Sequence, residues 1–113
     1  MTTQEIFDTV ARHLLTQNVK STGGQGGCKY LGDDGLKCAV GCLIPDEKYD
    51  PKIEGRGVDE VTSFLPFHVT GKRLDLLCTL QELHDGKYPR DWRVGLHRIA
   101  TEYKLLHAVL FTV

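Results

Sequence analysis

Three of the four cysteines, Cys28, Cys38 and Cys42, lie close together in the sequence. Thiolates bind zinc and act as nucleophiles in covalent catalysis. Structural zinc sites usually contain closely spaced ligand pairs, whereas the spacing here is C-x9-C-x3-C. If a metal binds at all, we expect it to be zinc at these three cysteines, with Cys78 or a histidine as the fourth ligand. Otherwise we expect no cofactor.

A catalytic role for Cys38 would require a neighbouring group that lowers its pKa. Cys38 is expected to begin a helical turn, and a helix N-terminus has this effect. The candidate base is His84, which Asp85 follows directly. Adjacent helical residues point in different directions, so we do not expect Asp85 to orient His84. Because cysteine is also among the most buried residue types, we predict that the cysteines pack in the core and favour a non-enzymatic protein.

The cysteine segment is also a candidate for a small binding pocket. Tyr30 and Tyr49 flank the segment, and a buried Glu54 would be suited to acid–base chemistry. The candidate pocket residues are Tyr30, Cys38, Tyr49, Glu54 and His84.

Charged side chains predict a different kind of site, a surface that contacts a partner. The segment 46–60 is rich in acidic residues, and the last helix has a basic face. The net charge of −1 gives no overall attraction to nucleic acid, which we do not expect as a partner. The candidate surface residues are Asp46, Glu47, Asp50, Arg90 and Arg93.

The elements that position these residues are mainly helical. Apolar spacing predicts a first helix between Thr2, which forms a capping box with Glu5, and Asn18. Further helices are predicted over 58–65, from residue 70 or 71 to Gly86, and from Trp92 onwards. The glycine-rich stretch 21–27 is expected to be a loop, and it lacks the Gly-Lys-Ser/Thr sequence of a phosphate-binding loop.

Residues 28–38 predict a β-hairpin, because CKYL and LKC flank the turn sequence GDDG. The following CAVGCLI predicts a short helical turn that ends before Pro45. The C-terminal LLHAVLFTV either extends the last helix or adds a third strand to the hairpin. The sequence therefore predicts one α+β domain over residues 1–113, with about four helices and a small hairpin.

Targeting signals are not evident in the sequence. The N-terminus MTTQEIFDTV lacks the pattern of a signal peptide, and no apolar run has the length of a membrane span. We expect a cytoplasmic protein with reduced cysteines and no membrane partner. The oligomeric state stays open.

Three segments of the chain resemble a family of small uncharacterised proteins of bacteriophages and bacterial prophages. These are HLLTQNVKS, CKYLGDDGLKCAVGCLIPDEKYDPKIEG and LQELHD, and the similarity covers roughly residues 5–103. The resemblance implies the cytoplasm of a bacterial host. It also implies a protein that binds and modulates a host protein or defence complex.

Two other functions stay open from the sequence. One is a small ligand-binding or hydrolytic domain with a pocket around Cys38. The other is a zinc-stabilised module that binds nucleic acid through the basic face of its last helix.

Overall fold

The structure is a computed structural model that describes residues 1–24 and 26–113. Three α-helices form its frame: α1 (Thr3–Gln17), α2 (Lys72–Gly86) and α3 (Trp92–Glu102). Short 3-10 helices occupy much of the rest of the described chain: η1 (Asp33–Gly35), η2 (Gly41–Leu43), η3 (Asp46–Lys48), η4 (Pro51–Ile53), η5 (Val58–Glu60), η6 (Thr62–Phe64), η7 (Pro89–Asp91) and η8 (Ala108–Phe111). Residue 25, within the predicted glycine-rich loop, lies outside the described residues.

The first helix confirms its sequence prediction. The Thr2 hydroxyl accepts the Glu5 backbone N–H at 3.1 Å, and the Glu5 carboxylate accepts the Thr2 N–H at 2.9 Å. Asn18 ends the helix in the left-handed conformation with φ 53°. The apolar face is fully buried at Ile6, Phe7, Val10, Ala11 and Leu14.

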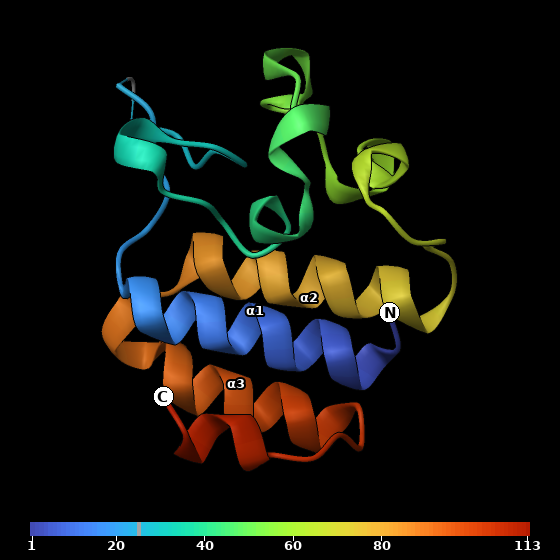
Figure 1. The fold of residues 1–113 in the computed structure, drawn as a ribbon. Helices are drawn as coiled ribbons and strands as arrows, with labels where there is room; N and C mark the ends of the chain where they lie inside the picture. Colours follow the sequence, from blue (N-terminus) through green and yellow to red (C-terminus); the bar gives the residue numbers. More distant parts are fainter. Residues whose placement is uncertain (25) are drawn as a thin grey trace.

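Helix α1 packs against both α2 and α3, so the three helices share one hydrophobic core. The loops and 3-10 turns between α1 and α2 cover one side of α2, while α3 and the C-terminal residues lie on the other side (Figure 1). Helix α3 approaches α2 closely at Gly95, where a Cβ atom would meet the Leu83 side chain. Its first residue, Trp92, is fully buried.

The predicted β-hairpin over 28–38 is wrong, and with it the α+β fold class. The described residues contain only isolated bridges there, Leu31 with Lys37 and Thr22 with Cys28, and no strand. Three N–H groups of this segment are bound by side chains and so are not available to a strand ladder. Those of Tyr30 and Leu31 donate to the Glu54 carboxylate, and that of Lys37 donates to the Gln17 side chain.

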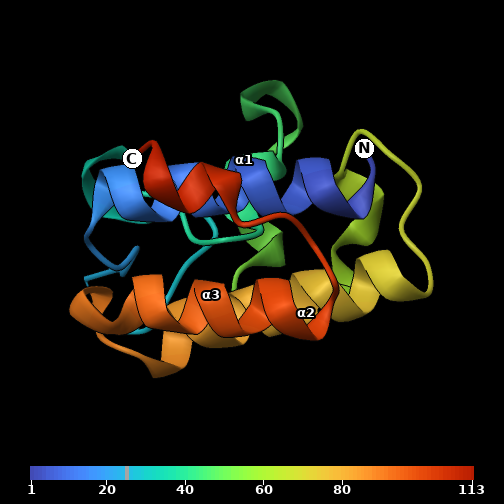
Figure 2. The ribbon, with the colours of Figure 1, turned by 90° about the horizontal axis from the view of Figure 1, so that it is seen from below.

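Two other predicted elements also differ from the structure. The helix expected over 58–65 consists of two 3-10 turns that meet at Val61, so the described chain has three α-helices rather than about four. The C-terminal residues neither extend the last helix nor form a strand. Lys104 adopts a left-handed conformation with φ 56°, which reverses the chain after α3. Turn η8 then packs against α1 and α3 (Figure 2).

Within the described part of the chain, no helix combines the length and the apolar character that a membrane span requires.

Candidate functional site

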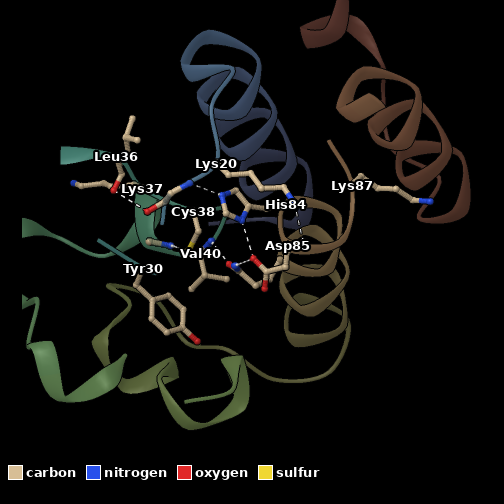
Figure 3. Close-up of polar contacts among 12 residues, drawn as sticks. Lys20, Tyr30, Leu36, Lys37, Cys38, Val40, His84, Asp85 and Lys87 are labelled. Atoms are coloured by element: carbon tan, nitrogen blue, oxygen red, sulfur yellow. Dashed lines mark hydrogen bonds and ion pairs between the residues drawn. The ribbon is translucent and has the colours of Figure 1, made fainter. Parts of the chain in front are cut away.

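His84, in the last turn of α2, joins this helix to the loop that follows α1. Its imidazole is fully buried, and its Nε2 atom lies 3.0 Å from the Ser21 backbone N–H (Figure 3). Because that N–H must donate, Nε2 accepts and Nδ1 carries the proton. Nδ1 then donates to the Asp85 carboxylate at 2.7 Å. The expectation that Asp85 would not orient His84 is therefore wrong.

The Asp85 carboxylate is fixed by several donors. The side chain of Gln81, one turn earlier in α2, donates to the same Oδ1 atom at 2.9 Å. Burial by itself would raise the pKa of Asp85, but the hydrogen bonds from His84 and Gln81 outweigh it and hold that pKa below its usual range. The carboxylate is therefore ionised at neutral pH. Its side chain is also 44% exposed, and contact with water favours the same charged form.

A cavity of about 370 Å³ opens beside this carboxylate. One wall is a face of α2, and the other walls are the segments 28–30 and 55–58 with Cys38. The residues that line it are Cys28, Lys29, Tyr30, Cys38, Gly55, Arg56, Gly57, Val58, Cys78, Gln81, Glu82 and Asp85. Three of the four thiols thus border one cavity.

The thiols of this cavity are poor nucleophiles. Burial raises the pKa of Cys38 to about 12, although the Gly41 N–H donates to its sulfur. Burial and then the negative charge of Asp85 raise the pKa of Cys28, and burial raises that of Cys78. All three are protonated at neutral pH, and a thiol attacks only as its thiolate.

The Cys28 sulfur and one atom each of His84 and Asp85 lie within 4.8 Å of one another. These residue types resemble a catalytic triad, but the hydrogen bonds do not support a proton relay. The lone pair of His84 Nε2 is already bound by the Ser21 N–H, so it does not take a proton from Cys28. Nucleophilic catalysis at this group would require the buried loop to separate from α2.

The same hydrogen bonds oppose metal binding at this group. A metal ion on His84 Nδ1 would require the proton on Nε2, which would then face the Ser21 N–H at 3.0 Å. The zinc ligand set proposed from the sequence does not assemble among the described residues. Cys42 does not line the cavity shared by Cys28 and Cys38, and its thiol donates to the Ala39 carbonyl at 3.1 Å.

The remaining pocket candidates form a neighbouring cross-link. The two Glu54 oxygens accept the N–H groups of Tyr30 and Leu31 at 2.9 and 3.1 Å, and one of them also accepts the Tyr49 hydroxyl at 2.6 Å. The Tyr30 hydroxyl donates to the Arg56 carbonyl at 2.6 Å. Of the five pocket residues expected from the sequence, Tyr30 and Cys38 line the cavity. Glu54 and Tyr49 support its wall, and His84 orients Asp85.

The acidic candidate residues make local interactions on the loops that cover α2. Asp46 pairs with Lys37 at 2.6 Å, and Asp50 accepts the Lys52 N–H at the start of η4. Glu47 is exposed.

The basic candidates belong to other elements: Arg90 to η7 and Arg93 to α3. Helix α3 lies on the side of α2 opposite these loops (Figure 1). Arg90 lies over the Tyr88 ring, with 5.0 Å between its guanidinium carbon and the ring centre. Arg93 donates to the carbonyls of Leu110 and Val113, so it fixes the C-terminal segment. The acidic and basic residues therefore do not form one surface.

The pocket expected from the sequence did not include the four cavity residues on α2: Cys78, Gln81, Glu82 and Asp85. Their spacing of three, four and seven residues places them on one face of a helix, and this spacing is the signal that could have found them. The leucines of α2 indicate only its buried side, which is a different face of the helix.

In comparisons with protein families, curated proteins and solved structures, the chain has no significant match.

Proposed function

We propose that this helical protein is a binding protein whose ligand site is the cavity beside Asp85. The observation that carries the proposal is an ionised carboxylate, held by His84 and Gln81, in the wall of a 370 Å³ cavity. This volume is within the range of small-molecule sites. Because hydrogen bonds already fix the carboxylate, a ligand would not have to order it.

Binding without catalysis suits the chemistry of this cavity. Its thiols have raised pKa values, and the lone pair of its neighbouring imidazole is bound. The cavity nevertheless offers charged groups, thiols and a tyrosine ring for recognition.

A fragment library screened by ligand-observed NMR tests this function even though the ligand is unidentified. Cys78→Phe places a large ring in the cavity wall, whereas Leu106→Phe enlarges a side chain that is 72% exposed. We expect fragments that bind the wild type to bind L106F and not C78F, with circular dichroism showing that both variants fold. An absence of binding fragments, or equal binding to C78F, would contradict the proposal.

We propose a second function, the binding of a host protein, as the resemblance to phage proteins implies. The observation that favours it is a group of exposed apolar side chains near the C-terminus: Leu106, Phe111 and Val113 are 72%, 77% and 38% exposed.

The test is a pull-down from host extract, followed by calorimetry with the purified partner. The double variant L106D/F111D should lose the partner, and D34N, at an exposed turn residue outside the candidate surface, should retain it. Equal capture by both variants would reject this surface.

A further inference from the structure

Opposite charges line different walls of the cavity beside Asp85. Glu82 and Asp85 belong to α2, whereas Lys29 and Arg56 belong to the facing loops. Glutamate, aspartate, lysine and arginine are all charged at neutral pH in ordinary surroundings. The cavity therefore has one anionic wall and one wall that carries cations.

These charges do not neutralise one another directly. Among the described residues, the ion pairs within 4.0 Å are Lys37 with Asp46 and His84 with Asp85. Neither Lys29 nor Arg56 is therefore within pairing distance of Glu82 or Asp85. The cavity separates the two sets of charges, and a ligand with both charges would bridge them.

The cavity lining also includes less polar residues. Cys28, Cys78, Val58 and Tyr30 are thiol, aliphatic and aromatic residues. A volume of about 370 Å³ is near the lower end of the range for small-molecule sites. A compact ligand with an aliphatic body suits these walls better than a nucleotide or a sugar.

We propose that the cavity binds a small aliphatic zwitterion of the amino-acid or dipeptide class, with its ammonium group at Glu82 and Asp85 and its carboxylate at Arg56. This inference rests on the proposed binding function and specifies its ligand. Asp85 offers its Oδ2 atom, because the hydrogen bonds from His84 and Gln81 are made to Oδ1. Arg56 also lines the cavity, and an arginine guanidinium can pair with a carboxylate through two parallel hydrogen bonds.

Isothermal titration calorimetry with four probes tests this ligand class. Leucine and alanyl-leucine carry both charges, leucinamide lacks the carboxylate, and 4-methylpentanoate lacks the ammonium group. We expect at least one zwitterion to bind about tenfold more tightly than either singly charged probe, since each charged hydrogen bond contributes on that scale. A preference between leucine and alanyl-leucine would identify the source of the zwitterion.

Charge-removing variants assign the two ends of the ligand. Glu82→Gln, at an exposed side chain, should weaken leucine and leucinamide but not 4-methylpentanoate. Arg56→Gln should weaken leucine and 4-methylpentanoate but not leucinamide. Glu47→Gln, an exposed carboxylate outside the cavity lining, serves as the control and should bind like the wild type.

Equal affinity for zwitterionic and singly charged probes, or no binding of either zwitterion, would overturn the inference. If library fragments still bind the wild type and not C78F, the cavity remains a ligand site and only this ligand class fails. If no fragment binds either, the proposed binding function fails as well.

Discussion

The imidazole of His84 donates to the carboxylate of Asp85, its neighbour in the sequence, across 2.7 Å. The other ring nitrogen of His84 accepts the Ser21 N–H at 3.0 Å. One buried side chain thus connects the loop after α1 to the carboxylate in the cavity wall. The orientation of the Asp85 carboxylate and the packing of the loop on α2 depend on these two hydrogen bonds.

His84→Leu should destabilise the protein by about 1–3 kcal/mol, because it leaves the buried Ser21 N–H without an acceptor. It also removes the imidazole that stacks on Trp92, with 5.4 Å between the ring centres. Urea unfolding measures this loss. His68→Leu, at an exposed loop position, is the control and should change stability little. Equal effects of the two substitutions would show that the His84 hydrogen bonds contribute nothing.

Glu54→Gln should also cost about 1–3 kcal/mol of unfolding free energy. Glutamine retains one acceptor oxygen for the three donors from Tyr30, Leu31 and Tyr49, and its NH2 group faces a donor. The matched control is Glu47→Gln, because Glu47 is exposed. The account of the cavity wall would be wrong if both variants unfolded at the same urea concentration as the wild type.

Gly41→Ala should severely destabilise the protein, because the added Cβ would overlap the carbonyl group of Tyr30. Gly86→Ala, at the end of α2, meets no atom within 4 Å and should be neutral or stabilising by up to about 1 kcal/mol. Thermal unfolding of the two variants distinguishes them. A G41A protein with the wild-type melting temperature would contradict the packing of η2 beneath Tyr30.

Stability should fall as the pH decreases below about 6.5, in part because of His13. Burial lowers the pKa of His13 below its ordinary value of 6.5, although a hydrogen bond to the Lys37 carbonyl opposes this effect. The unfolded chain then takes up the proton first as the pH falls, so protonation favours unfolding. His13→Gln keeps a donor for Lys37 and does not titrate.

Urea unfolding of the wild type and H13Q at pH 8 and pH 5 measures this contribution. The stability of the wild type relative to H13Q should be lower at pH 5 than at pH 8. An unchanged difference would mean that the pKa of His13 is the same in the folded and unfolded states.

Local interactions explain which parts of the fold the sequence predicted. The capping box of Thr2 and Glu5 spans three residues, so both α1 and its start follow from the sequence. The hairpin prediction failed because the N–H groups of residues 30 and 31 bind Glu54, which is more than twenty residues away. A turn signal such as GDDG does not encode that distant acceptor.

The lining of the candidate cavity was predictable to a similar extent. Tyr30 and Cys38 were expected at a pocket, because they belong to the segment with the unusual cysteine spacing, and both line the cavity. The contribution of α2 was not expected. It depends on the packing of residues 28–30 and 55–58 against Gln81 and Asp85, which local sequence patterns do not reveal.

The most direct test of the proposed binding cavity is a ¹H–¹⁵N NMR titration of the protein with a fragment that binds it. The account predicts saturable shifts of the backbone amides of Cys28, Tyr30, Gln81 and Asp85, which C78F abolishes. Shifts confined to other surfaces, such as residues 106–113, and unchanged in C78F would contradict it.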